Sequence, residues 1–227
     1  QTCHMGFDHP QWEMYSSSKH GVRYGLKQKK LLPENASAPT CQNCHMQEGN
    51  HEVRTAWGFL AVRLPMPDDL LWKQDRTTIL QALGVLDPAG NPTKRLDAVK
   101  SVQLVRTTEE EWQKERDKML KTCNQCHSSN FSKSELGKGD RVIKEADRVM
   151  AEAIRVVAGL YKDGTLPKPK TYAYAFPDLL TFNDAPTSIE QTLFKMFLEY
   201  GTGPSRGRST TARIMRGGTV GARCRTP

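Results

Sequence analysis

Cys41-Gln42-Asn43-Cys44-His45 and Cys123-Asn124-Gln125-Cys126-His127 are two complete C-x-x-C-H sequences, and Gln1-Thr2-Cys3-His4 carries the last part of a third. Two thiols separated by two residues can add to both vinyl groups along one edge of a porphyrin, and the histidine that follows can bind the iron as its proximal ligand. The motifs therefore predict c-type haem at three sites. Attachment is expected at Cys3, Cys41, Cys44, Cys123 and Cys126, and proximal ligation by His4, His45 and His127.

A C-x-x-C pair alone has rival interpretations, as half of a zinc site or as a thioredoxin-like redox pair. Neither of them requires the histidine that follows the second cysteine. A zinc ribbon also needs its two pairs roughly 15 to 20 residues apart, whereas about eighty residues separate the two complete motifs here. Haem attachment is the interpretation that accounts for every residue of the motif.

The three histidines outside the motifs are His9, His20 and His51. A low-spin electron-transfer haem usually needs a second axial ligand, and neutral imidazole is a common iron ligand. A lone surface histidine ordinarily has no role, but three haems that need capping favour distal ligation by His20 and His51. The sequence leaves open which haem each of them caps.

The composition indicates a chain with a modest apolar core, because only 37% of its 227 residues are hydrophobic. Haem faces can supply apolar surface, so we expect the protein to fold around its cofactors. The chain contains no run of 18 or more apolar residues, so the sequence predicts no transmembrane helix. The chain starts with Gln1 and shows no signal peptide, which fits a fragment with its export signal upstream. Since haem c is attached outside the cytoplasm, the expected compartment is the bacterial periplasm.

With five cysteines assigned to haem, Cys224 is left alone and no disulfide framework is expected.

The formal net charge of +8 is concentrated near the end of the chain. Residues 201–227 hold six arginines and no acidic residue, which leaves about +2 for residues 1–200. Each haem also adds two propionates. The charge therefore does not predict nucleic-acid binding.

Helical signals dominate the sequence. Residues 107–111 supply hydroxyl caps and first-turn acids for a helix over 112–121 that leads to Cys123. Asp140 is expected to cap the next helix, which Gly164 ends. In that helix one apolar row recurs at helical spacing and predicts a packing face on haem or on a neighbouring subunit: Val142, Ala146, Val149, Ala153, Val156 and Leu160, flanked by Ile143, Met150, Ile154 and Val157.

A third helix is expected over 188–200, with Leu193, Phe194, Met196 and Phe197 buried. The proline-rich stretches 64–67 and 167–169, and Pro177, indicate extended connections. The predicted class is mostly α, a multihaem cytochrome c fold with long loops packed around covalently bound haems.

Several stretches, taken together in their order and spacing, resemble the hydroxylamine oxidoreductase family of octahaem cytochromes. They are Cys3-His4-Met5-Gly6-Phe7-Asp8-His9, Trp12-Glu13, Tyr15, Ser18-Lys19-His20-Gly21, Ala38-Pro39-Thr40-Cys41, Cys44-His45-Met46 and residues 122–128. The resemblance covers residues 1 to about 200, the expected multihaem cytochrome region, and implies the last three of about eight attachment sites. It further implies a homotrimer, with haems arranged as electron wires and a catalytic haem attached upstream of this chain.

The resemblance also implies a catalytic role for Asp8 and His9, which match an Asp-His pair that projects into the family's substrate pocket. An adjacent carboxylate and imidazole form a sensible proton-accepting pair, because oxidation of hydroxylamine releases protons together with electrons. Two other interpretations stay open: His9 as a further axial ligand, and Asp8 as the cap of a helix that starts at Pro10. His20 and His51 match positions that serve as distal ligands.

The chain departs from the family after Tyr200, where residues 201–227 form an Arg/Gly/Thr-rich tail. The family's oxidising members carry a tyrosine near this end that cross-links to the catalytic haem of a neighbouring subunit, and no match to it is evident. Synonymous codons read two bases further on give a sequence that resembles the family's continuation, so a frameshift is one explanation of the tail. A genuine disordered basic tail is the other.

The leading functional hypothesis is oxidation of hydroxylamine to nitrite or nitric oxide, with electrons passing through the haems to a cytochrome c acceptor. The fragment itself is expected to be inactive, because its catalytic haem lies upstream. The alternatives are a reductive octahaem enzyme, acting on nitrite or hydroxylamine, and a non-catalytic multihaem electron-transfer cytochrome. The cross-linking tyrosine distinguishes the first two, and a five-coordinate haem would exclude the third.

Overall fold

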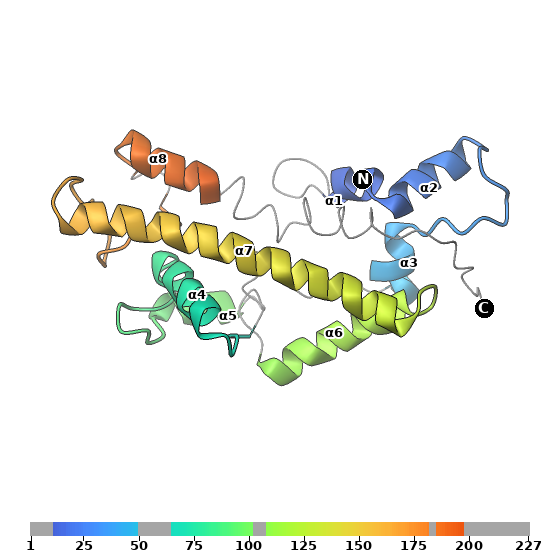
Figure 1. Ribbon diagram of the computed structural model, residues 1–227, viewed down its shortest axis with the longest axis horizontal. Helices are drawn as coiled ribbons and strands as arrows, with labels where there is room; N and C mark the ends of the chain where they lie inside the picture. Colours follow the sequence, from blue (N-terminus) through green and yellow to red (C-terminus); the bar gives the residue numbers. More distant parts are fainter. Residues whose placement is uncertain (1–10, 50–64, 102–107, 182–184, 198–227) are drawn as a thin grey trace.

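The computed structural model describes residues 11–49, 65–101, 108–181 and 185–197, and this part of the chain is mostly helical (Figure 1). Its α-helices are α1 (Gln11–Ser17), α2 (Lys19–Gln28), α3 (Cys41–His45), α4 (Leu70–Ala82), α5 (Lys94–Ser101), α6 (Glu109–Cys123), α7 (Ser129–Lys162) and α8 (Ser188–Lys195), and η1 (Gln47–Gly49) is a 3-10 turn. Within the described ranges the only β pairing is an isolated bridge between Leu86 and Pro92. The predicted mostly α class is confirmed.

Helix α7 is the longest described element and crosses the whole view in Figure 1. Its 34 residues extend about 50 Å at the usual rise per residue. Ser128 caps its start, since the Ser128 hydroxyl accepts the backbone N–H of Phe131 at 3.3 Å. The helix ends at Lys162, and Gly164 follows in a left-handed conformation (φ +80°), as the sequence predicts.

The expected cap at Asp140 is wrong, because α7 begins eleven residues earlier and runs through this position. Ser128 directly follows the second complete motif and already supplies the capping hydroxyl. Asp140 instead pairs with Arg116 of α6, where the guanidinium nitrogen lies 2.6 Å from the carboxylate oxygen. An aspartate inside a helix is tolerated where its side chain finds such a partner outside the local backbone.

The main apolar core lies along the second half of α7. Ile154 and Val157 are buried against Leu80 of α4 and against Leu193 and Phe194 of α8. Of the two apolar rows that the sequence shows on α7, the flanking row with Met150, Ile154 and Val157 therefore forms this core. In the first row Ala153 and Leu160 are partly buried against the same core, whereas Val149 and Val156 are 46% and 57% exposed. Its packing on haem or on a neighbouring subunit stays a prediction.

Helix α6 starts as the sequence predicts and leads directly into the second complete motif. The Thr108 hydroxyl accepts the backbone N–H of Glu111 at 3.2 Å, and the Glu111 carboxylate accepts the N–H of Thr108 at 3.0 Å. This reciprocal capping box fixes the first turn. Figure 1 shows α6 and α7 meeting at the motif in a V.

Helix α8 confirms the start of the predicted third helix, with Leu193, Phe194 and Phe197 buried and Met196 partly buried. Residues 198–200, the expected end of this helix, lie outside the described residues, as do the tail 201–227 and Leu64 of the first proline-rich stretch. The described prolines of those stretches lie outside the helices, as predicted. No described helix is both long enough and apolar enough to cross a bilayer.

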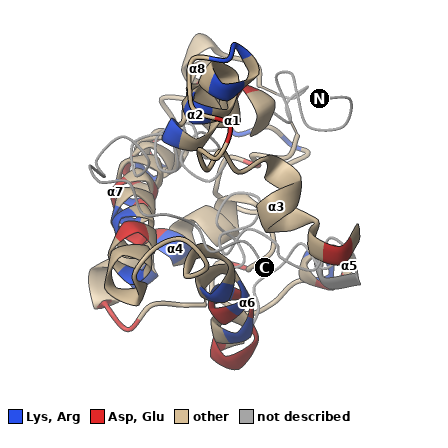
Figure 2. Ribbon diagram, turned by 90° about the vertical axis from the view of Figure 1, so that its right-hand side faces the viewer, with Lys and Arg blue, Asp and Glu red and all other residues tan. Residues whose placement is uncertain are grey.

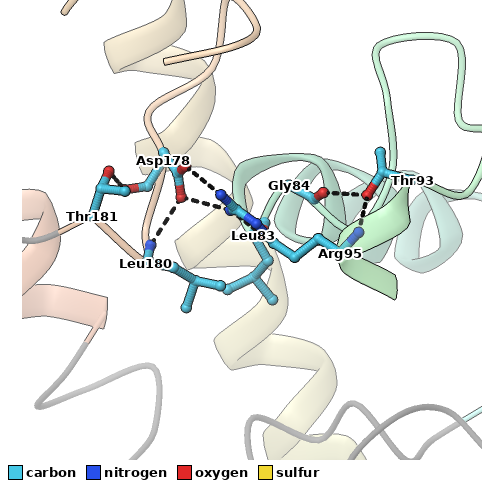
Figure 3. A network of polar contacts seen from close by, with 7 residues as sticks. All are labelled: Leu83, Gly84, Thr93, Arg95, Asp178, Leu180 and Thr181. Atoms are coloured by element: carbon cyan, nitrogen blue, oxygen red, sulfur yellow. Dashed lines mark hydrogen bonds and ion pairs between the residues drawn. The ribbon is translucent and has the colours of Figure 1, made fainter. Parts of the chain in front are cut away.

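Two ion pairs between distant parts of the sequence hold the core elements in place. Arg95 of α5 binds Asp178 through two nitrogen-oxygen contacts of 2.9 and 3.0 Å, and it also donates to the carbonyl of Leu83 (Figure 3). Arg76 of α4 donates to the carboxylate of Asp147 on α7 at 2.9 Å, and only 3% of the Arg76 side chain is exposed. Such pairs fix the register of α4 against α7 and of the 178 segment against α5.

Asp147 is the buried acceptor on which the α4–α7 contact depends. It also accepts the indole N–H of Trp72 at 2.7 Å. Burial raises the pKa of Asp147, while Arg76 and Trp72 oppose the rise. The net gain from this pair is therefore small, whereas loss of one partner would leave the other charge buried and uncompensated.

We expect Asp147→Ala to lower the free energy of unfolding by roughly 3–5 kcal/mol, because Arg76 loses its buried counter-charge. Urea denaturation of the haem-loaded protein, followed by circular dichroism, measures this loss. Glu145→Ala is the matched control on the same helix, since the Glu145–Arg148 pair is more than half exposed and is expected to contribute less than about 1 kcal/mol. Equal losses for the two variants would contradict the assigned role of Asp147.

Candidate haem-binding site

The first complete motif forms a short helix of its own. α3 spans Cys41–His45, so Cys41 and Cys44 lie three residues apart on one helical face. The side-chain oxygen of Asn43 accepts the backbone N–H and the hydroxyl of Thr40, both at 2.8 Å. The two variable residues of the motif are thus not equivalent: Asn43 stabilises the turn that presents the two thiols.

The second complete motif occupies the junction between α6 and α7. Cys123 is the last residue of α6, and its carbonyl accepts the N–H of Cys126 at 3.1 Å and that of His127 at 3.0 Å. Ser128 then caps α7. The motif is therefore one closed helical turn held at both ends by long helices.

The two motifs are neighbours in space although about eighty residues separate them in the sequence. The Gln47 amide, just after the first motif, donates to the Gln125 side-chain oxygen of the second at 3.2 Å. Burial and the nearby Cys44 thiol raise the pKa of Cys123 to about 11. Two haems attached to these motifs are thus held near one another, which suits electron transfer between them.

The rings of His20 and His127 are close neighbours. Their ring centres are 6.0 Å apart and their planes are inclined by 30°. An imidazole nitrogen binds a first-row metal at about 2 Å, so two imidazoles on opposite sides of one metal place their ring centres about 6 Å apart. The residues present therefore fit a haem c attached at Cys123 and Cys126, with His127 as proximal and His20 as distal ligand.

The position of His20 depends on close packing between α1 and α2. Ser18 caps α2 by accepting the N–H of Gly21 at 3.1 Å, and it donates its own hydroxyl to the Tyr15 carbonyl at 2.7 Å. A β-carbon added to Gly21 would lie 1.9 Å from that carbonyl oxygen, which excludes any larger residue without a shift of the helix. The cap at Ser18 and the close packing at Gly21 thus fix the position of the His20 imidazole on α2.

The surroundings of both imidazoles favour the neutral form that a metal requires. Burial is the largest cause that lowers the pKa of His20, and His127 and Arg23 add to it. Burial also lowers the pKa of His127, which Glu135 partly opposes. The ring of Phe131 lies 4.7 Å from that of His127, one turn into α7, and supports it from the protein side.

Tyr15 connects the N-terminal helices to the first motif. Its hydroxyl donates to the carbonyl of Pro39 at 2.7 Å, immediately before α3. Burial is the main cause that raises the pKa of Tyr15 to about 12, with Cys41 and Cys44 adding to it. This hydrogen bond joins the helix pair that carries His20 to the segment directly before the first motif.

Among the described motif cysteines, Cys41, Cys44 and Cys123 carry free thiols, the form that thioether attachment to haem requires.

The remaining predicted site residues cannot be placed. Cys3, His4, Asp8, His9 and His51 lie outside the described residues. His45 is exposed and is the last residue of α3.

Sequence reasoning assigned no role to several residues that build the site. For Gly21 a signal existed, since a glycine directly after a ligand histidine indicates a close backbone approach. Phe131 also had one, because it follows His127 by four residues and so shares a helical face with it. The contact between Gln47 and Gln125 had no signal in the sequence. The two residues lie 78 positions apart, and only the fold brings them together.

Comparison with known proteins agrees with this geometry. Residues 1–63 and 95–173 match the family model described as "Seven times multi-haem cytochrome CxxCH". A "Probable nitrite reductase-hydroxylamine oxidoreductase fusion protein" of Kuenenia stuttgartiensis is 31% identical over an alignment of 190 positions, which covers 77% of this chain and 20% of that protein.

Two solved structures share the fold. A "Hypothetical multiheme protein" has a TM-score of 0.55 at 19% identity, over 97% of this chain and 50% of the other. The Kuenenia stuttgartiensis "reducing HAO-like protein complex Kustc0457/Kustc0458" has a TM-score of 0.59 at 20% identity, over 94% of this chain and 51% of the other. The chain thus spans about half the length of these structures and one fifth of the fusion protein.

The two C-x-x-C-H motifs are held by helices, and the ring of His20 lies beside that of His127. These features are typical of a protein built around covalently bound c-type haems. The chain belongs to the multihaem c-type cytochrome family, and its resemblance to hydroxylamine oxidoreductases is confirmed. The prediction of haem c as the cofactor is confirmed with it, although the number of haems is a separate question.

We expect His20→Ala, in the full-length haem-loaded protein, to convert one low-spin haem into a high-spin haem, because one iron loses its distal imidazole. Electron paramagnetic resonance of the oxidised protein counts the two spin states. Val22→Ala, at an exposed position two residues further along α2, is the control and keeps the wild-type spectrum. An unchanged spectrum for His20→Ala would show that His20 is no iron ligand.

Gly21→Ala is expected to weaken the same ligation without removing the histidine, since the new methyl group forces α2 away from the Tyr15 carbonyl. Some of the protein should then show the high-spin signal of His20→Ala. Gly25→Ala is a matched control, because nothing lies within 4 Å of a β-carbon there. That substitution should keep the spectrum and stabilise α2 by about 0.5–1 kcal/mol. The positioning argument fails if both glycine variants behave alike.

Proposed function

We propose that the chain is part of a hydroxylamine oxidoreductase-like enzyme that oxidises hydroxylamine to nitrite or nitric oxide and passes the electrons through c-type haems to a cytochrome c acceptor. The observation that supports the electron-transfer part is the 6.0 Å distance between the ring centres of His20 and His127, beside the motif of α3. The substrate rests on the family resemblance and on the name of the Kuenenia relative.

The described residues act as an electron-transfer part of the enzyme. When bound, a haem c supplies one-electron redox chemistry. His127 and His20 would hold the iron of a haem attached at Cys123, and a haem held by two histidines would leave no position for a substrate. Gln47 and Gln125 keep the two attachment motifs adjacent. Substrate chemistry is therefore assigned to another haem, attached upstream.

The chain's proposed contribution to that chemistry is Asp8 and His9. An imidazole beside a carboxylate can take up the protons that leave the nitrogen and oxygen of hydroxylamine during oxidation. The carboxylate of Asp8 stabilises the imidazolium that results. Both residues follow the haem motif of Cys3 and His4 within five positions, so the proposed substrate pocket and the first electron-transfer step share one segment.

A reductive enzyme is the second candidate, because the two relatives' names include nitrite reductase activity and a reducing complex. The scaffold and the axial histidines serve either direction of electron flow. A homotrimer and a periplasmic location are proposed with both candidates, on the family resemblance. The division into a cytochrome region over 1–200 and an atypical tail over 201–227 is likewise proposed.

We expect Asp8→Asn and His9→Gln, each in the full-length haem-loaded enzyme, to slow hydroxylamine oxidation by roughly 10²–10⁴-fold, the usual contribution of a positioned proton acceptor. Steady-state reduction of a cytochrome c acceptor measures the rate, and the spin-state spectrum should stay that of the wild type. Glu48→Gln, at an exposed position after α3, is a control that keeps the wild-type rate.

Three other results would redirect the assignment. A new high-spin haem in His9→Gln would make His9 an axial ligand rather than a catalytic residue. Nitrite or hydroxylamine reduction with a viologen donor, without hydroxylamine oxidation, would favour the reductive enzyme. An absence of turnover in both directions, with every iron bound by two histidines, would favour a pure electron carrier.

A further inference from the structure

The charged residues of α2 and its C-terminal turn all have the same sign. Between Met14 and Pro33 the sequence contains no aspartate or glutamate. The same stretch contains five cations, Lys19, Arg23, Lys27, Lys29 and Lys30. In Figure 2 acidic and basic residues alternate along α6, whereas the charged residues of α2 are basic only. A single-sign group of this kind, here called the α2 basic surface, is unusual within the described part of the chain.

Most of this positive charge is available to a partner. Arg23 donates to the carbonyl of Ser37 at 2.9 Å, and Lys27 to that of Ala36 at 3.0 Å. Carbonyl oxygens orient these side chains but do not neutralise them. Lys29 and Lys30 are exposed, and among the described residues their side chains form neither a hydrogen bond nor an ion pair.

Lys30 occupies a backbone position that favours glycine. Its φ is +57°, and the N–H groups of Lys30 and Leu31 close the end of α2 by binding the carbonyls of Lys27 and Leu26, both at 2.9 Å. Glycine is the usual residue at this position of a helix end, because a side chain is disfavoured in the left-handed region. A lysine at this position costs some stability relative to glycine and places its charge at the end of α2.

Two apolar side chains lie among the cations. Val22 is 49% exposed and Leu31 is 66% exposed. A small apolar centre with a charged rim is the usual composition of a transient protein docking surface. An isolated anion site would not need exposed aliphatic groups.

The α2 basic surface lies directly beside the proposed haem site. His20 belongs to the same helix, and Arg23 is close enough to lower the pKa of His20. A partner bound here would approach the metal position between His20 and His127 from the distal side. Short distance to a haem and complementary charge are the two requirements for rapid electron exchange between proteins.

We infer that the α2 basic surface is the docking site for an acidic electron-transfer protein, which exchanges electrons with the haem held by His20 and His127. This inference rests on the proposed electron-transfer role and adds to it the surface and the charge of the partner. Docking is electrostatically steered, so its affinity falls as ionic strength rises.

Lys29→Glu/Lys30→Glu in the haem-loaded protein tests the inference. The probe is an acidic single-haem cytochrome c with zinc in place of iron, so that binding is measured without electron transfer. We expect its dissociation constant to rise at least tenfold at low ionic strength, with the difference from wild type vanishing at high salt. Lys73→Glu/Lys114→Glu makes the same charge change at exposed positions of α4 and α6 and should leave binding close to wild type.

Lys30→Gly separates docking from folding. It removes one charge and also relieves the left-handed backbone, so the melting temperature should rise while binding of the zinc cytochrome weakens. Loss of binding in this variant therefore cannot result from misfolding.

Two results would overturn the inference. One is binding that the α2 variants leave unchanged, or that both pairs of substitutions weaken equally. The other is unchanged binding together with a shifted reduction potential of one haem, which would show that these cations serve the haem propionates instead. Because the zinc cytochrome reports docking alone, the absence of enzyme turnover would reject the proposed function without deciding this question.

Discussion

The approach of the His20 ring to the His127 ring is the contact around which the motif-bearing end of the described structure is arranged. His127 lies directly after the turn between α6 and α7, and the centre of its ring is 6.0 Å from that of His20. The Ser18 cap, the absent side chain at Gly21 and the Tyr15 hydrogen bond to Pro39 all serve that approach. The first motif then follows beside the second, since it is joined to the same helix pair.

The distribution of apolar residues explains why the cofactor matters for stability. The main core gathers along the second half of α7, against α4 and α8. Near the motifs few apolar side chains are buried, with Met14 one of them. Within the described residues that end is held together mainly by hydrogen bonds, so bound haem faces would supply apolar contact there. The low hydrophobic content predicts such a dependence on the cofactor but does not indicate which end of the molecule it concerns, and the dependence stays a prediction.

The sequence predicts those features that local chemistry determines. The C-x-x-C-H motifs, the capping box of Thr108 and Glu111 and the stop at Gly164 each involve residues within a few positions of one another. The failed cap at Asp140 shows the limit, because Ser128, twelve residues earlier, competes for the same function and the local pattern does not rank the two residues. Pairing of His20 with His127 depends on how α1 and α2 return to the α6–α7 junction. Only the tertiary structure shows this.

The proposed electron path, from other haems to an exit beside α2, depends on one iron binding between His20 and His127. The most direct test is a structure of the full-length haem-loaded protein, by crystallography or electron cryomicroscopy. We predict an iron, in the haem attached at Cys123 and Cys126, bound by one nitrogen of His127 and one of His20 at about 2 Å each. An iron at that haem with a different distal ligand, or His20 bound to another haem, would contradict the account.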